Sequence, residues 1–191
     1  FTSLKNIEFI YPSSLKSIGD NTFNCCKFLE QISIPSSVYH LGAGTFTRCP
    51  SLKKIIFEKS SSLTSIDKDV FKFCISLQYI SIPSSIVSIG DYAFIGCSSL
   101  VEILFESPSS LKYIGNEAFS GCSSLEDVKI PTSVTSIGEN AFNRNIVEDN
   151  ESPYNNDDNY KNSIIYKLMY EDDIMNHEYD FISTLSQIYH L

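Results

Sequence analysis

Cysteine is the residue of this sequence with the widest chemistry, because a thiolate can attack a carbonyl, bind a metal ion or form half of a disulfide. Cys97 stands in the run IGCSSL, where the small residues after it would suit a nucleophile. A single copy would leave nucleophile, metal ligand, disulfide partner and packing residue all open. The position recurs, however, three residues after each of five phenylalanines, at Cys26, Cys49, Cys74, Cys97 and Cys122. A periodic column of this kind indicates a structural role.

The other apparent catalytic motifs are weak. The pattern S-x-x-K, which some serine hydrolases use, occurs at residues 13–16 and 109–112, but both copies lie in a turn that the whole chain repeats. The three histidines have no acidic or cysteine partners at the spacing of metal ligands: His40, His177 and His190. We therefore expect no catalytic centre, no cofactor and no metal site, and we interpret the chain as non-enzymatic.

The elements that position these residues are repeats. Leucine returns at intervals of 25, 23, 25, 23 and 25 residues, at Leu4, Leu29, Leu52, Leu77, Leu100 and Leu125. Phenylalanine returns at intervals of 23, 25, 23, 25 and 23, at Phe23, Phe46, Phe71, Phe94, Phe119 and Phe142. Two lengths therefore alternate in a 48-residue pair, and the longer repeats carry two additional residues at 10–11, 58–59 and 106–107. Such periods are typical of solenoids, propellers and arrays.

Residues 77–100 illustrate what one repeat predicts. The run LQYISI alternates apolar and variable residues in the period of a strand with one buried face. Pro83 then ends the strand, because proline has no amide proton to donate. A second apolar pair, Ile86 and Ile89, leads to Gly90, where we expect a turn with positive φ. The A-F-x-x-C segment that follows has the i, i+3 spacing of a short helical turn.

These residues resemble a known family. The run L-x-x-I-x-I-P-x-S-V-x-x-I-G-x-x-A-F-x-x-C-x-S-L, nearly intact in 77–100 and 100–125, is similar to the BspA-like class of leucine-rich repeats. The resemblance covers about residues 1–145, six times over. It implies a leucine-rich repeat solenoid: a right-handed curved stack of 23- and 25-residue coils, with a concave parallel sheet and short helical turns opposite. Members are typically secreted or cell-surface proteins that bind other proteins, without catalysis in the repeats.

The resemblance also answers the question of the cysteines. In leucine-rich repeats this column points inward and bonds to loop backbone, which implies a structural ladder of Cys26, Cys49, Cys74, Cys97, Cys122 and Asn145. Consecutive members are expected about one strand spacing apart, ~4.8 Å, but their parallel Cβ vectors oppose disulfides. We expect buried free thiols, with disulfides and a metal or nucleophile role as the alternatives. Cys25 lies outside the column and is expected to be exposed.

The outward positions of the strands supply the candidate binding surface. The two residues that flank the middle isoleucine of L-x-x-I-x-I face solvent, and the middle repeats place large apolar residues there. An apolar centre with a charged rim is typical of a protein-binding patch. The candidate residues are Tyr79, Ile56, Leu104 and Val101, with Lys54, Glu102 and the inserted Glu58 at the rim. The alternative is that these are scattered exposed apolar residues without function.

Charge is distributed unevenly along the chain. Of 14 basic and 23 acidic residues, residues 146–191 hold only 2 basic but 10 acidic ones. No stripe of Lys and Arg is present, which disfavours nucleic acid as a partner. No apolar run approaches the ~20 residues of a membrane-spanning helix.

Three regions follow from these patterns. Residues 1–145 form the repeat domain, 146–162 an acidic Asn/Asp-rich linker, and 163–191 two amphipathic helices. These helices could cap the stack, start a truncated second region or dock on a partner. No N-terminal cap sequence is visible, and Phe1 occupies a repeat position, so we expect that earlier repeats were removed.

Two functions remain open at this stage. The first is an extracellular module that binds proteins or mediates adhesion, as the resemblance implies. The second is an intracellular scaffold that holds a protein partner for a linked domain, since unpaired ladder thiols suit a reducing compartment. The resemblance thus suggests the cell surface or secretion, while the thiols keep the cytoplasm open. An enzyme is a distant third possibility.

Overall fold

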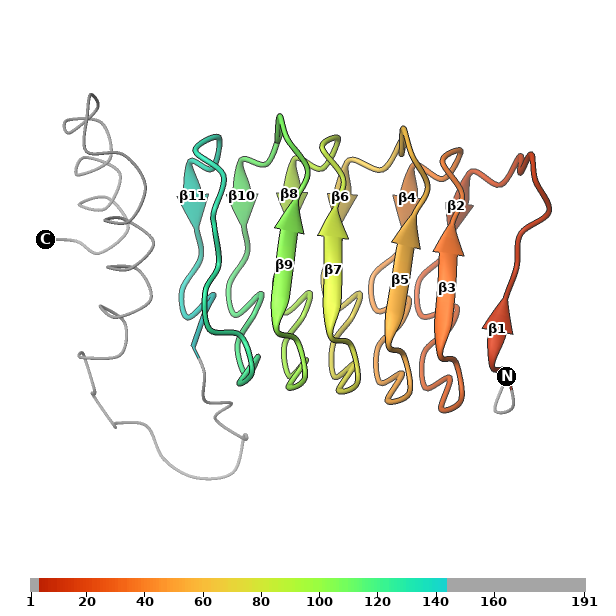
Figure 1. Ribbon diagram of the computed structural model, residues 1–191, viewed down its shortest axis with the longest axis horizontal. Helices are drawn as coiled ribbons and strands as arrows, with labels where there is room; N and C mark the ends of the chain where they lie inside the picture. Colours follow the sequence, from red (N-terminus) through yellow and green to blue (C-terminus); the bar gives the residue numbers. More distant parts are fainter. Residues whose placement is uncertain (1–3, 144–191) are drawn as a thin grey trace, which may run out of the picture.

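The computed structural model describes residues 4–143, which form a stack of coils with parallel strands on two sides (Figure 1). One strand per coil builds a five-stranded parallel sheet, here called the front sheet, in the order β1-β3-β5-β7-β9. Its members are β1 (Asn6–Ile7), β3 (Gln31–Ile34), β5 (Lys54–Phe57), β7 (Tyr79–Ile82) and β9 (Glu102–Phe105). These are the L-x-x-I-x-I segments, so the repeat solenoid with a parallel sheet is confirmed.

Two-residue strands form the opposite side of the stack, here called the back face. They are β2 (Ser17–Ile18), β4 (His40–Leu41), β6 (Ser65–Ile66), β8 (Ser88–Ile89), β10 (Tyr113–Ile114) and β11 (Ser136–Ile137). Parallel pairing joins β2 to β4, and β6 to β8, β10 and β11 in turn. Each of the first five coils therefore adds one strand to the front sheet and, on the way back, one short strand behind it, and the sixth coil adds β11.

Hydrophobic side chains from every coil fill the space between the two faces. Between the first and the last coil, the repeat leucines and isoleucines are almost completely buried, including Leu29, Ile32, Leu52, Leu77, Ile89 and Leu100. The repeat phenylalanines stack face to face from Phe23 to Phe142, with neighbouring ring centroids 5.0 to 5.6 Å apart. A single coil could not bury these rings, so each coil depends on its neighbours for its stability.

The prediction of short helical turns is wrong. The described residues contain no helix, and the A-F-x-x-C segments form consecutive turns instead. In coil 2, the amide of Thr47 bonds within its own turn, whereas the amides of Phe46 and Arg48 donate to Val70 and Lys72 of the next coil. A helix satisfies its amides internally. Here alternate amides bond to the next coil instead. Arg48, one of the residues that bond in this way, has a left-handed backbone with φ 55°.

The predicted reason for the repeat glycines is also wrong. Gly115 does not have the positive φ expected of it; positive φ occurs two residues later, at Glu117 with 51°. Gly115 is needed because the preceding coil passes too close for a side chain. A Cβ there would lie 2.5 Å from the amide nitrogen of Asp91 and 2.6 Å from the carbonyl carbon of Gly90. Glycine thus allows close packing of adjacent backbones.

The one repeat without this glycine coincides with a break on the back face. Asp67 stands where the coil two repeats later has Gly115. The amide of Gly115 donates to Ile89 of the preceding coil at 2.8 Å, and strands β8 and β10 pair there. The corresponding strands at Asp67 are β4 and β6, which belong to two separate sheets. A Cβ at Asp67 prevents the close approach, and its carboxylate instead accepts a hydrogen bond from Ser65.

Some predictions concern segments where the structure differs or gives no description. The sixth repeat, LEDVKI at residues 125–130, was expected to form a strand, but the structure assigns none there, and nothing in it explains the difference. The acidic linker at 146–162 and the helices at 163–191 lie outside the described residues. No helix among residues 4–143 is long and apolar enough to cross a membrane.

Candidate protein-binding surface

The front sheet places three of the predicted site residues in one row. Lys54 of β5 pairs in register with Tyr79 of β7, and Tyr79 pairs with Glu102 of β9. All three side chains are exposed, because residues at this position flank the buried isoleucine of the strand on its outer side. Tyr79 therefore lies between a cation on one neighbouring strand and an anion on the other.

A second row lies two residues further along the same strands. Ile56 pairs with Ser33 on one side, and Leu104 pairs with Ser81 of β7. Ile56 and Leu104 are 40% and 58% exposed. Small serines therefore alternate with large aliphatic side chains across the front sheet, and Ser81 occupies the strand between Ile56 and Leu104.

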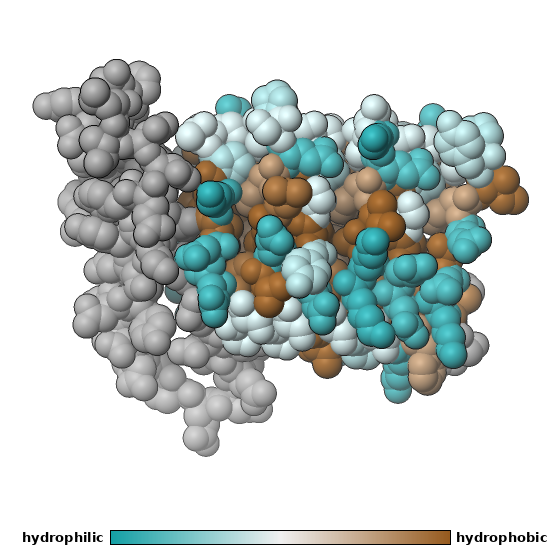
Figure 2. All heavy atoms as spheres, viewed as in Figure 1, coloured by the Kyte–Doolittle hydropathy of each residue, from teal (hydrophilic) through white to brown (hydrophobic). Residues whose placement is uncertain are grey.

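Together these residues form an apolar patch on the front face. Figure 2 views this face and shows hydrophobic side chains over the middle strands, with hydrophilic side chains among and beside them. The patch comprises Ile56, Tyr79, Val101 and Leu104, and Val101, directly before β9, is 41% exposed. Ile56, Tyr79 and Leu104 occupy outward positions of the front sheet, and Val101 precedes it in the chain.

Ionic contacts on this face distinguish two neighbouring lysines. Lys53 forms an ion pair with Glu30 of the preceding coil, with 3.3 Å between Nζ and Oε2. Lys54 and Glu102 form no ion pair with any other described residue. The row through Tyr79 therefore carries two exposed charges of opposite sign that have no ionic partner within residues 4–143.

Glu58 has a structural role that sequence reasoning missed. Its carboxylate accepts a hydrogen bond from the amide of Ser36 at 3.0 Å, and its own amide donates to Ile34. Glu106, 48 residues later, bonds to Ser84 and Ile82 in the same way. The inserted glutamate thus binds the second and third long coils to the short coil before each of them.

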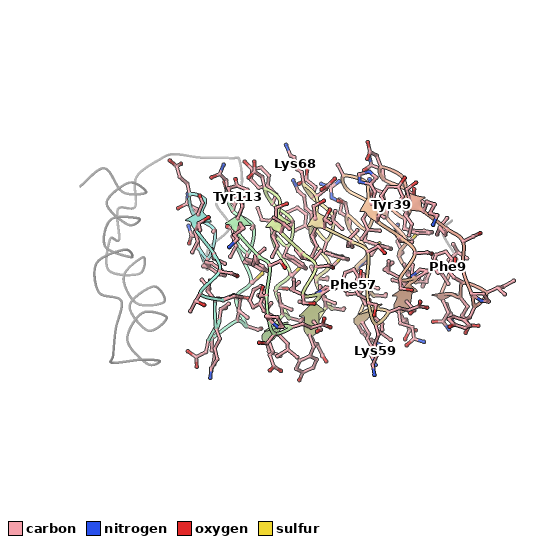
Figure 3. All side chains as sticks on the ribbon, turned by 90° about the horizontal axis from the view of Figure 1, so that it is seen from above. Phe9, Tyr39, Phe57, Lys59, Lys68 and Tyr113 are labelled. Atoms are coloured by element: carbon pink, nitrogen blue, oxygen red, sulfur yellow. The ribbon has the colours of Figure 1, made fainter. Side chains whose placement is uncertain are left out.

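A signal for this role was present in the sequence. Glutamate occupies the first inserted position in two of the three long repeats, directly after the strand segment. The second inserted residue is different, because Lys59 projects from the front side of the stack (Figure 3), whereas Phe57 points into the interior. Of the inserted pair, it is therefore Lys59 that is free to contact a partner.

The ladder cysteines are buried and bond to the coil before their own. Cys49 donates to the carbonyl of Phe23, Cys74 to Phe46, Cys97 to Phe71 and Cys122 to Phe94, with sulfur–oxygen distances of 3.1 to 3.3 Å. All six cysteines of the described chain are free thiols. Asn145, the expected sixth ladder residue, lies outside the described residues. The carbonyls of Phe23, Phe71 and Phe94 also accept the backbone amides of Cys26, Cys74 and Cys97, so the thiols add a second hydrogen bond that joins neighbouring coils.

A hydrogen bond with Cys74 lowers the pKa of the Cys49 thiol. Burial keeps the other three thiols protonated, because it raises the pKa of Cys122 to about 12 and raises the pKa values of Cys74 and Cys97 well above the ordinary value of 9.0. Because the thiolate is the reactive form, such groups do not act as nucleophiles near neutral pH. Cys25 differs, since its thiol is exposed and lies 3.0 Å from the amide oxygen of Asn24.

Another cluster that the sequence analysis did not identify lies on the turns. Basic side chains cover two aromatic rings there: Lys68 and Lys72 lie over Tyr92, each at 5.5 Å, and Lys72 and Arg48 lie over Phe73. Lys72 also pairs with Asp69 at 3.3 Å. No group of three His, Cys, Asp or Glu residues within 4–143 could hold a metal ion.

Comparison with known families and structures gives a consistent result. The model of a family described as "BspA type Leucine rich repeat region (6 copies)" matches residues 1–101 and 57–167. A leucine-rich repeat protein from Bacteroides ovatus is similar in structure, with a TM-score of 0.65 and 35% identity over 75% of this chain. No curated protein sequence matches significantly.

Two further solved structures are similar. The pneumococcal vaccine antigen PcpA has a TM-score of 0.57 and 28% identity over 73% of this chain. A leucine-rich cell surface protein from Faecalibacterium prausnitzii has a TM-score of 0.52 and 27% identity, also over 73%. The matched region spans only 36% of the Bacteroides ovatus protein, 40% of PcpA and 44% of the Faecalibacterium protein.

Proposed function

Because this chain belongs to the BspA-type leucine-rich repeat family, we propose that it is a non-catalytic module that binds a protein partner with its front sheet. The observation that supports this most is the exposed apolar patch of Ile56, Tyr79, Val101 and Leu104. Large apolar side chains gathered on one rigid sheet, with charges beside them, are the arrangement in which binding hot spots occur.

The rigidity of the surface favours binding. The patch residues stand on hydrogen-bonded strands whose inner side chains are buried, including Ile55, Ile80 and Ile103. Little conformational entropy is therefore lost when a partner docks, since the backbone is already ordered. A cell-surface or adhesive role is the form of this function that we propose, because one similar structure is that of a leucine-rich cell surface protein.

Two matched tyrosines provide the test. Tyr79 on the front sheet is 57% exposed, and Tyr39 on the back face is 56% exposed (Figure 3). Proteins captured by the immobilised intact chain would be identified, and their affinities for Tyr79→Ala and Tyr39→Ala compared. Tyr79→Ala should weaken binding by more than ~1 kcal/mol, whereas Tyr39→Ala should leave it unchanged. Equal effects of the two substitutions would reject the front sheet as the binding surface.

A second candidate function is an intracellular scaffold that holds a partner for a linked domain. The observation in its favour is that the cysteines of the described chain are all unpaired, as is usual in a reducing compartment. Treatment of intact producing cells with a membrane-impermeant amine reagent distinguishes the two locations. Modification of exposed lysines such as Lys59 supports the surface protein, while protection until lysis supports the scaffold.

A further inference from the structure

The second and third long coils carry opposite charges at the same repeat position. Lys54 and Glu102 are 48 residues apart and occupy equivalent places at the start of β5 and β9. Tyr79 of the intervening short coil pairs with both. The two charged side chains therefore start from the same row across the front sheet, and their charges are opposite.

The register fixes how far apart these charges lie. Adjacent strands of a sheet are separated by ~4.8 Å, so Lys54 and Glu102 stand about 10 Å apart across β7. They are too distant to neutralise one another directly, and Tyr79 rises between them. A partner that covers Tyr79 must therefore bring groups close to both charges.

Burial of these charges determines which partner is accepted. Removal of a charged group from water is costly unless an opposite charge replaces the lost hydration. Within residues 4–143, neither Lys54 nor Glu102 has an ionic partner that could do so. A partner with two like charges would leave one of them facing its own sign, which opposes association.

The second row provides a place for an apolar group beside Tyr79. Ser81 pairs with Leu104 and lies two residues beyond Tyr79 on the same strand, and its hydroxyl donates to the Glu106 carboxylate at 3.5 Å. Its small side chain lies on the strand between the larger Ile56 and Leu104, which are both exposed. An apolar side chain of the partner that packs here would bury aliphatic surface on either side.

We propose that the partner of the front sheet is a polypeptide segment with one acidic and one basic side chain about 10 Å apart and an apolar side chain between them. This inference rests on the proposed function. The separation corresponds to about seven residues of a helix, at ~1.5 Å each, and side chains seven residues apart lie on the same helix face. The acidic group would face Lys54 and the basic group Glu102.

Selection from a random peptide library displayed on phage tests the proposal with the intact chain as the target. The wild-type protein should enrich peptides with one acidic and one basic residue that flank an apolar residue. Lys54→Glu, which makes both charges negative, should enrich peptides with two basic residues. Glu102→Lys should enrich peptides with two acidic residues. A peptide selected on the wild type should bind either variant about tenfold more weakly. Thermal unfolding would verify that each variant is folded.

A fourth target, Tyr79→Ala, separates this inference from the function on which it rests. One outcome would overturn the inference and leave the binding surface in place. In that outcome, the wild type, Lys54→Glu and Glu102→Lys select peptides with the same charge pattern, and these peptides lose binding to Tyr79→Ala. Peptides that bind Tyr79→Ala as well as the wild type would contradict both. Failure of the wild type to enrich any peptide would also count against the proposed partner.

Discussion

At the scale of single residues, the cysteine column shows how position decides chemistry. The same side chain is protonated and hydrogen-bonded at Cys97, deep in the stack, and exposed at Cys25 on a turn. Burial raises the pKa of Cys97 well above its ordinary value, which removes the thiolate needed for nucleophilic attack. The ladder thiols therefore stabilise the fold, while reactivity is left to Cys25.

Thiol labelling tests this division. Native protein treated with a maleimide should be modified rapidly at Cys25, whereas the buried thiols should react only after unfolding in urea. The reason is access as much as pKa, since Cys97 is completely buried. Mass spectrometry of peptides from the labelled protein would locate the modified residues. Rapid modification of Cys97 in the native protein would contradict the buried ladder.

The apolar residues of the repeat could be predicted from spacing alone, whereas the polar and glycine positions could not. Columns of Leu, Ile and Phe must point inward because only stacking can bury them. The reason for Gly115 depends on how closely the preceding coil passes, which no single repeat reveals. Glu58 was predicted at the rim of the binding surface, and its bond to Ser36 could be found only once the coils were stacked.

At the scale of elements, alternate coils are not equivalent. The glutamates of the second and third long coils bond to the short coil before them, and the front strands pair over four residues within each such pair of coils. Between units, β5 and β7 pair only at Lys54 and Tyr79. The prediction of a helical turn failed at this scale, because the i, i+3 spacing does not show whether an amide bonds within its turn or to the next coil.

Two glycines of one column offer a direct test of the close approach between coils. Gly115→Ala should lower the free energy of unfolding by ~1 to 3 kcal/mol, because the new Cβ would overlap the backbone of Asp91. Gly19→Ala is the matched control, since a Cβ there meets only the hydroxyl of Thr22 at 3.7 Å. Its effect should stay within ~0.5 kcal/mol. Urea denaturation provides both values, and equal losses would argue against the close approach.

At the scale of the whole molecule, stability comes from the stack and function from its surface. The phenylalanine ladder runs through all six coils, and Phe94 stacks on Phe71 and Phe119 with ring centroids 5.1 and 5.0 Å away. No coil is independent of the next, so the front sheet is held as one rigid platform. The repeat period predicted this architecture, but the identity of the partner depends on surface residues that the repeat does not constrain.

Removal of one ring from the ladder should weaken the whole stack. Phe94→Ala is expected to cost ~3 to 5 kcal/mol, because it leaves a cavity between two stacked rings. Phe28→Ala, at a site that is 51% exposed, should cost less than ~1 kcal/mol. Thermal or urea unfolding of the two variants would measure the difference. Similar stability of both variants would exclude a continuous aromatic core at Phe94.

Photocrosslinking tests most directly the claim that the front sheet binds a protein partner. Benzoylphenylalanine would replace Tyr79 in one protein and Tyr39 in another, two aromatic positions of almost equal exposure on opposite faces. Each protein would be irradiated with the partner captured by the intact chain, and the products separated by mass. We expect a crosslinked complex from position 79 and none from position 39. Crosslinking from position 39 alone, or equally from both, would contradict the assignment of the front sheet as the binding surface.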